Sequence, residues 1–319
     1  MAKKKEPKRA MGRARAPRGR QGARGDVRDI VLFLAQRKLL EHDGRAAGIK
    51  FNKLVFSIYN EFSGASNPEL RFDLPYRWYL YGAVIDTGEL GGIIAFDHQD
   101  EMRSNVIWTG PPPNLDSAAV PEIERLCDAF CSRFPGDLYY GDMLREHYRA
   151  AREPFQNAFL EWNLLVGDMI HGSRDISVKE LKGHLAALGR DYPDGLEPRL
   201  TPSFRRLSLC LDDILSRATV LRFEEVKVME ALMWEFWATF CLFLSLRYNH
   251  AISKPRLDSY RERAERELVA YKRRLGAALE TRYLDSRAGE GIDEASMKEL
   301  ASILEPRVLR LMGRTGSSQ

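Results

Sequence analysis

Two cysteines four residues apart come closest to a reactive cluster in this sequence. Cys127 and Cys131 fall on one face of a predicted helix, because residues four apart are neighbours on a helix surface. Two thiols alone make neither a zinc site nor a redox centre, and no ligand spacing selects His147 as a further ligand. Core packing is the better interpretation of these thiols and of Cys210 and Cys241, which also lie in apolar helical segments. The sequence therefore predicts no metal, no cofactor and reduced thiols in a cytoplasmic protein.

A second pattern, an arginine and a histidine separated by four residues, spans Arg37 to His42. It resembles the catalytic pair of HEPN ribonucleases, which are helical proteins. With 49 Lys and Arg and six His in the chain, one such match is expected by chance. The sequence has no phosphate loop, dinucleotide-binding, zinc-protease or serine-hydrolase motif. We therefore expect a protein that is not an enzyme, and a helical ribonuclease is the least favoured alternative.

The strongest functional signal is electrostatic and lies in the first 25 residues. This segment holds ten basic residues and one acidic residue, a charge of +9; since the whole chain carries +4, the remaining 294 residues carry −5. Small residues and prolines separate the charges, so the segment cannot form a core, and residues 1–25 are predicted to be a disordered arm. Its basic residues are Lys3, Lys4, Lys5, Lys8, Arg9, Arg13, Arg15, Arg18, Arg20 and Arg24.

Such an arm suits a phosphate backbone. Basic side chains near a nucleic acid release condensed counterions, which gives a salt-dependent affinity without sequence preference. Arginines between small residues also suit RNA or a narrow minor groove. We therefore predict that the arm binds nucleic acid, either DNA or RNA, with a solubilising tail as the alternative. The apolar run from Ile30 to Ala35 is too short for a secretory signal, so the expected location is the cytoplasm, with association with the nucleoid as one option.

Residues 26–110 are predicted to form a small α+β domain. Asp26 is a candidate N-cap for a first helix, and apolar residues at helical spacing mark a second helix between Gly48 and Gly64. Residues 93–96 and 106–108 read as strands on either side of a polar tip, which predicts a hairpin. Two helices followed by a hairpin outline a winged helix, in which Lys50, Lys53, Arg77 and Arg103 would contact nucleic acid.

The aromatic run Trp78 to Gly82 is predicted to be extended. Side chains alternate along a strand, so Trp78 and Leu80 share one face and Tyr79 and Tyr81 share the other. An aliphatic residue beside tryptophan indicates the core face. We therefore expect Trp78 and Leu80 to be buried.

Two motifs in this region resemble a known group of families. Residues 51–56 (FNKLVF) and the following WYLYG at 78–82 are similar to the K-L-x-F and Y-x-Y-G-P pattern of YwgA-like winged-helix proteins, and more remotely to the Panacea antitoxin domain. Ala83 stands where that pattern has proline, and residues 84–90 make a poor recognition helix. The resemblance implies a winged-helix fold and either DNA binding or control of a toxin partner.

Three consecutive prolines, Pro111 to Pro113, divide the chain. They hold an extended segment, so residues 111–116 are predicted to link two domains. Every segment of residues 117–313 reads as helix, which predicts an all-α bundle. Ser177 to Glu180 form a capping box at the start of one helix, and the last helix is expected from Asp293. Residues 314–319 are predicted to be a disordered tail. The fold class is therefore mainly α, with a winged-helix-like α+β domain before a helical bundle.

Two long segments of the bundle carry further predictions. The apolar run from Ala231 to Leu246 contains Glu235 and is shorter than a membrane span, so it is predicted to be a buried core helix, and no membrane partner is expected. The segment from Arg256 to Tyr283 repeats apolar residues at spacings of three and four. This stripe fits either packing inside the bundle or a homodimer.

These patterns leave two main classes of function. The favoured class is a nucleic-acid-binding regulatory or conflict-system protein, associated with DNA and using both the arm and the winged-helix-like domain. The alternative is a protein-binding adaptor or antitoxin-like module, in which the acidic body contacts a protein partner.

Overall fold

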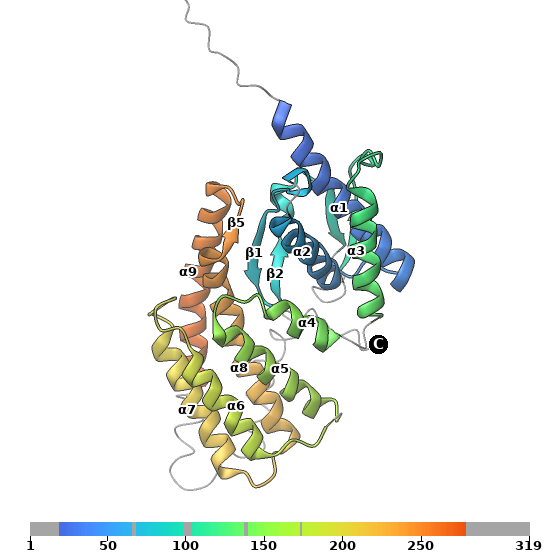
Figure 1. Ribbon diagram of the computed structural model, residues 1–319. Helices are drawn as coiled ribbons and strands as arrows, with labels where there is room; N and C mark the ends of the chain where they lie inside the picture. Colours follow the sequence, from blue (N-terminus) through green and yellow to red (C-terminus); the bar gives the residue numbers. More distant parts are fainter. Residues whose placement is uncertain (1–18, 66–67, 98–103, 137–139, 173, 279–319) are drawn as a thin grey trace, which may run out of the picture.

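The computed structural model describes residues 19–65, 68–97, 104–136, 140–172 and 174–278. The chain is mainly helical with small antiparallel sheets, as the sequence predicts. Figure 1 shows two groups of helices, α1 to α3 and α5 to α9, on either side of the hairpin β1–β2. The predicted tail and the last predicted helix, from Asp293, lie outside the described residues.

The first group consists of α1 (Gly19–Asp43), α2 (Gly48–Gly64) and α3 (Val120–Arg133), and α1 packs against both of the others. α1 begins at Gly19, seven residues before the predicted cap Asp26, so residues 19–25 of the predicted arm have helical backbone. Ile30, Leu34 and Phe51 are fully buried in the shared core. α3 lies beyond the three prolines but completes this first core, so the prolines do not separate two hydrophobic cores.

Two hairpins follow α2. The three-residue helix η1 (Pro68–Leu70) leads to β1 (Tyr76–Tyr79) and β2 (Gly82–Ile85), which pair antiparallel across a turn where Gly82 has a φ of 98°. After the short helix η2 (Thr87–Glu89), β3 (Ile94–Asp97) pairs with β4 (Asn105–Trp108), which confirms the predicted hairpin. Residues 84–90 form β2 and η2, so the chain has no recognition helix at this place.

Helix α4 (Tyr140–Tyr148) leads into the second group, which begins with α5 (Pro154–Ile170) and continues with α6 (Val178–Asp191) and α7 (Thr201–Arg217). The group ends with α8 (Phe223–Arg247) and α9 (Lys254–Ala278). The predicted cap at Ser177 is present, since its hydroxyl accepts a hydrogen bond from the Glu180 amide at 3.1 Å. Pro154 and Pro202 occupy first turns, where a missing amide hydrogen is harmless.

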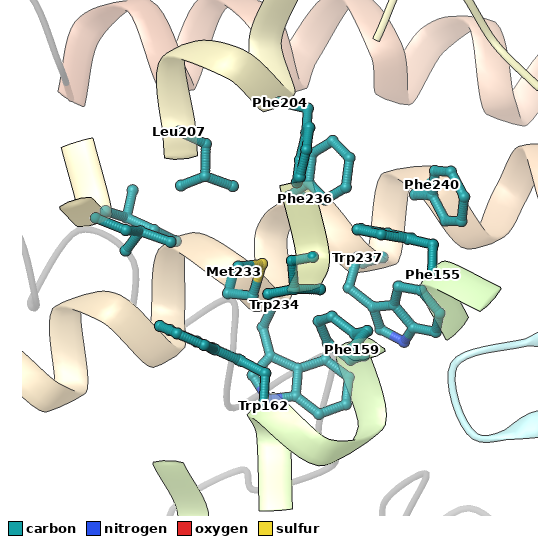
Figure 2. Packing of buried hydrophobic residues seen from close by; sticks show 14 of the residues in the cluster. Phe155, Phe159, Trp162, Phe204, Leu207, Met233, Trp234, Phe236, Trp237 and Phe240 are labelled. Atoms are coloured by element: carbon teal, nitrogen blue, oxygen red, sulfur yellow. The ribbon is translucent and has the colours of Figure 1, made fainter. Parts of the chain in front are cut away.

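The core of this group is built around α8, and Figure 2 shows its aromatic side chains. Phe159 of α5 stacks on Trp237 of α8 with ring centroids 3.9 Å apart. α8 is long and apolar enough to cross a membrane, but 94% of its apolar window is buried by the other helices, as predicted for a core helix. Leu268 and Tyr271 of the α9 stripe are buried in the same core, which accounts for this part of the stripe by packing inside the bundle. Residues 279–283 of the stripe lie outside the described residues.

The hairpin β1–β2 joins the two groups. β5 (Asn249–His250), which follows α8, pairs with β1, and so the three-stranded sheet has the order β2-β1-β5. The carbonyl oxygen of Leu80 accepts hydrogen bonds from Trp237 Nε1 and from the Tyr148 hydroxyl, each at 2.9 Å. Ser245 Oγ donates to the Trp78 carbonyl oxygen at 2.6 Å. The strand predicted for the first domain is thus part of the bundle.

The predicted faces of the aromatic run are confirmed. Trp78 is 3% exposed and Leu80 is 2% exposed, as predicted, whereas Tyr79 and Tyr81 are only half-buried. Trp78 belongs to the bundle core and also contacts Phe56 of α2.

Replacing Trp78 by alanine is expected to lower the free energy of unfolding by about 3 to 4 kcal/mol, because a large cavity opens between α8 and the sheet. Tyr79→Ala removes a half-buried ring and is expected to be milder. Urea unfolding of both variants measures the difference. A Tyr79 variant that unfolds at lower urea than the Trp78 variant would reverse the assignment of the two faces.

Candidate functional site

The basic residues predicted to contact nucleic acid fall into three sets. Eight arm residues, from Lys3 to Arg18, and the hairpin residue Arg103 lie outside the described residues. Arg20 and Arg24 belong to the helical backbone of α1. Lys50, Lys53 and Arg77 lie inside the protein or against its sheet.

Lys50 is a buried, paired lysine. It is 6% exposed, and its Nζ lies 2.5 Å from a carboxylate oxygen of Asp43 and 2.5 Å from the Phe134 carbonyl oxygen. Asp43 ends α1 and Phe134 follows α3, so Lys50 ties these two helix ends to α2. Its predicted contact with nucleic acid is therefore wrong, because the ammonium group is enclosed and satisfied within the protein.

Lys53 is buried and has no carboxylate partner in the part of the chain that the structure describes. It is 2% exposed, and among the described residues its Nζ makes one hydrogen bond, to the Ala83 carbonyl oxygen at 3.3 Å. Burial disfavours the charged form and lowers the pKa of Lys53 to about 7. This corrects the prediction for Lys53, since a phosphate of a nucleic acid cannot reach it.

His147 of α4 contacts the same residue, Ala83, through its backbone amide. Its Nε2 accepts a hydrogen bond from the Ala83 amide at 3.1 Å, which requires the unprotonated nitrogen. Burial and, secondarily, the nearby Lys53 hold the pKa of His147 well below its usual range. A Cβ at Gly82 would lie 2.6 Å from the His147 ring, so glycine is needed here both for its positive φ and for space. Lys53 and His147 therefore bind the carbonyl oxygen and the amide of one residue, Ala83, in the β1–β2 hairpin.

Arg77 of β1 lies between two tyrosine rings. Its guanidinium carbon is 4.7 Å from the centre of the Tyr79 ring and 4.6 Å from that of Tyr260 on α9. It donates to Ser245 Oγ at 3.2 Å, and its Nε is buried with no hydrogen-bond partner among the described residues. Arg77 is therefore partly buried and held against the sheet. The prediction required it to be part of an exposed basic face, which it is not.

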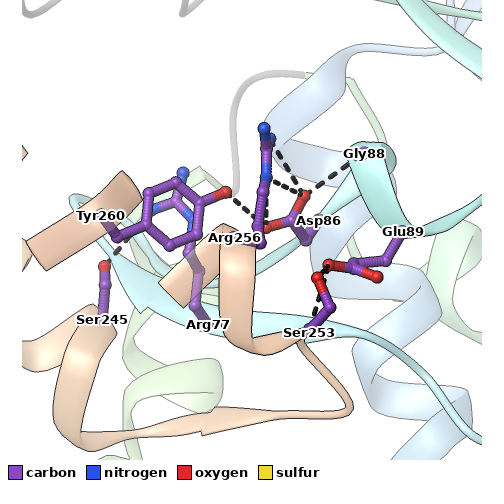
Figure 3. Close-up of polar contacts among 8 residues, drawn as sticks. All are labelled: Arg77, Asp86, Gly88, Glu89, Ser245, Ser253, Arg256 and Tyr260. Atoms are coloured by element: carbon purple, nitrogen blue, oxygen red, sulfur yellow. Dashed lines mark hydrogen bonds and ion pairs between the residues drawn. The ribbon is translucent and has the colours of Figure 1, made fainter. Parts of the chain in front are cut away.

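Figure 3 shows Asp86 at the centre of the adjoining polar network. The Asp86 side chain is 1% exposed and accepts hydrogen bonds from the Gly88 amide, from Arg256 Nε and from the Tyr260 hydroxyl. Burial, together with the Asp86 carboxylate, raises the pKa of Tyr260. Glu89 accepts from Ser253 at 2.6 Å, so η2 is fixed to the start of α9 at two points.

These side chains surround a cavity of about 320 Å³ between α2, the β1–β2 hairpin and α9. Its wall includes Lys53, Arg77, Asp86 and Arg256, and apolar surface comes from residues such as Leu80. The volume lies at the lower end of the range of small-molecule sites. This cavity is the candidate functional site of the described part of the chain.

Sequence reasoning missed most of this site. Asp86 stands in the segment dismissed as a poor recognition helix, and Tyr260 was assigned to an apolar stripe. Arg256 is 170 residues away from Asp86, and no local pattern relates two positions so far apart. The one available signal was a single acidic residue directly after the extended aromatic run.

The other chemical candidates are structural. All four cysteines are buried, and burial raises the pKa of Cys131 to about 11. Arg37 pairs with Glu41 at 2.8 Å, whereas His42 contacts Asp128, so Arg37 and His42 have separate partners. Within the described ranges no group of three metal-ligating side chains occurs.

Comparison of the chain with protein-family models, with curated protein sequences and with solved structures finds no match. The YwgA-like and Panacea-like resemblance stays a prediction based on two short motifs.

Proposed function

We propose that this protein binds nucleic acid through its basic N-terminal segment and acts as a regulatory or conflict-system protein. The observation that carries the proposal is the charge of +9 in residues 1–25, against −5 in the rest of the chain. A segment this basic has electrostatic affinity for a phosphate backbone, whatever the base sequence. The segment leads directly into α1, whose first turns extend beyond the other elements in Figure 1.

The ion pairs in the rest of the chain support the proposal that the N-terminal segment makes the main contact with nucleic acid. Several exposed arginines there have acidic neighbours: Arg37 pairs with Glu41 at 2.8 Å, and Arg145 with Glu161 at 2.9 Å. Arg199 contacts Glu265 at 2.8 Å. A paired cation offers little net attraction to phosphate, whereas residues 1–25 contain ten basic residues and a single acid, Glu6. The arm is therefore proposed as the main contact.

A winged-helix-like contribution is the finer part of the proposal. Its support is the order of two helices followed by antiparallel hairpins, with β3–β4 in the position of a wing. The buried lysines of α2 are no longer included in the contact. The alternative, an antitoxin-like module that binds a protein partner, keeps the support of the Panacea-like motifs.

Replacing the eight basic residues of positions 1–18 by glutamine tests the proposal in the full-length chain. We expect affinity for duplex DNA or single-stranded RNA to fall at least about a hundredfold at low salt, and the slope of log K against log salt to fall by about five. The melting temperature is expected to stay unchanged, because the buried core begins at Val27.

A matched variant replaces exposed, paired cations of α9, namely Lys254, Arg261 and Arg266, by glutamine. This variant should bind like the wild type. An equal loss per charge removed, eight charges in the arm variant and three in this one, would mean that net charge alone matters. Undiminished binding after neutralisation of the arm would refute the proposed role of the arm.

A further inference from the structure

The cavity between α2, the β1–β2 hairpin and α9 has an excess of hydrogen-bond donors. Lys53 can donate three hydrogen bonds and makes one, at 3.3 Å, within the described residues. Arg77 contributes a buried Nε that lacks a partner in the same part of the chain. Both side chains line the cavity. Its wall therefore offers donors of positive or potentially positive charge.

The carboxylate in the cavity wall already accepts hydrogen bonds from other residues of the protein. Asp86 is the one carboxylate among the described residues that line the cavity. One of its oxygens accepts from Gly88 N at 3.1 Å and from Arg256 Nε at 3.2 Å, and the other accepts from the Tyr260 hydroxyl. Asp86 thus neutralises Arg256, and within the described residues no carboxylate pairs with Lys53 or Arg77.

The volume of the cavity and its apolar lining limit the kind of ligand that can bind. The volume of about 320 Å³ admits a small organic molecule and excludes a polymer. Ile49, Leu80 and Val84 provide apolar surface beside the basic groups. Arg77 is held between two aromatic rings, so its guanidinium is already oriented before a ligand arrives.

We infer that this cavity binds a small organic anion, whose carboxylate or phosphate group accepts hydrogen bonds from Lys53 and Arg77 and whose apolar part lies against Leu80 and Val84. An acid group supplies the missing acceptors and the missing negative charge at once. The site is separate from the basic arm and does not depend on the function proposed for the arm.

Calorimetric titration of the full-length protein tests this inference with three probes: benzoate for a carboxylate, adenosine monophosphate for a phosphate ester, and inorganic phosphate for the acid group alone. We expect one of the two organic anions to bind at one site per chain and more tightly than inorganic phosphate. Lys53→Met and Arg77→Gln should each weaken that binding at least about tenfold.

The exposed variant Arg37→Gln serves as the control and should bind the probe like the wild type. Loss of binding in Lys53→Met would not reflect unfolding, because this substitution removes a buried amine whose one hydrogen bond within the described residues is long, at 3.3 Å. Binding that both cavity variants leave intact, and that duplex DNA displaces, would assign the anion to the arm and overturn the inference. Absence of saturable binding for all three probes would overturn it as well.

Discussion

Replacing Lys53 by methionine is expected to stabilise the protein by about 3 to 4 kcal/mol at pH 7. A fall of the Lys53 pKa from its usual 10.5 to about 7 corresponds to an upper value of roughly 5 kcal/mol, at ~1.4 kcal/mol per pH unit. Losing the long hydrogen bond to Ala83 offsets about 1 kcal/mol of this gain. Methionine keeps the length and flexibility of the side chain, so the packing of α2 is retained.

Lys50→Met is the matched control on the same helix and is expected to have the opposite sign. It leaves Asp43 as a carboxylate with 10% of its side chain exposed and without its ammonium partner, which costs about 3 to 5 kcal/mol. Denaturant unfolding at pH 7 compares the two variants directly. A destabilised Lys53→Met variant would show that the buried amine contributes favourable contacts in the folded protein.

The pH dependence gives this prediction a second readout. The folded protein holds Lys53 neutral down to about pH 7, whereas the unfolded chain binds that proton near pH 10.5. The wild type therefore loses stability as the pH falls through this window and loses no more from Lys53 below it. Lys53→Met lacks this loss, so its advantage should be small at pH 10.5 and largest at pH 7. Protonation of His147 adds a further loss below pH 6.5 in the wild type.

Residues 115–319 expressed alone are not expected to fold into the native bundle. Removal of β1 takes away the carbonyl oxygen of Leu80, which leaves Trp237 Nε1 and the Tyr148 hydroxyl without their acceptor. It also exposes the bundle surface that covers Trp78. In addition, α3 loses the core that it shares with α1 and α2. We expect the fragment to aggregate or to unfold without a cooperative transition in circular dichroism.

Cleavage of the intact protein at the same place is the matched experiment. Pro111 and Pro112 are exposed, so a protease site inserted there is accessible. The two fragments of the cut protein should remain together on size exclusion, because the sheet and the core hold them. A fragment of residues 115–319 that unfolds cooperatively by itself would restore the domain boundary predicted from the prolines.

The local features of this fold were predictable from the sequence. The hairpin β3–β4, the cap at Ser177, the core helix α8 and the burial of Trp78 each follow from periodicity or turn chemistry within a few residues. These signals depend on neighbours in sequence. Predictions from these signals therefore do not depend on how distant parts of the chain pack.

The environment of α2 was not predictable in the same way. Its apolar residues mark one face, so Lys50 and Lys53 were expected on the solvent side. α3 and α4, which come 70 to 90 residues later, cover that side as well. Periodicity reports which residues of a helix are apolar, but it does not report how many partners the helix acquires. The candidate cavity escaped prediction for this reason too.

The pairing of β1 with β5 has a consequence for how the chain is made. Tyr76 pairs with His250, so the outer edge of strand β1 in the first hairpin stays unpaired until β5 is synthesised, 174 residues later. At roughly 5 to 20 residues per second, this interval lasts on the order of 10 to 35 seconds on the ribosome. During that time the Trp78 backbone lacks its hydrogen-bond partners Ser245 and Tyr248, and the β1 edge is open to other nascent chains. Slowing translation between β2 and β5 should therefore increase aggregation during synthesis, even though the finished protein is unchanged.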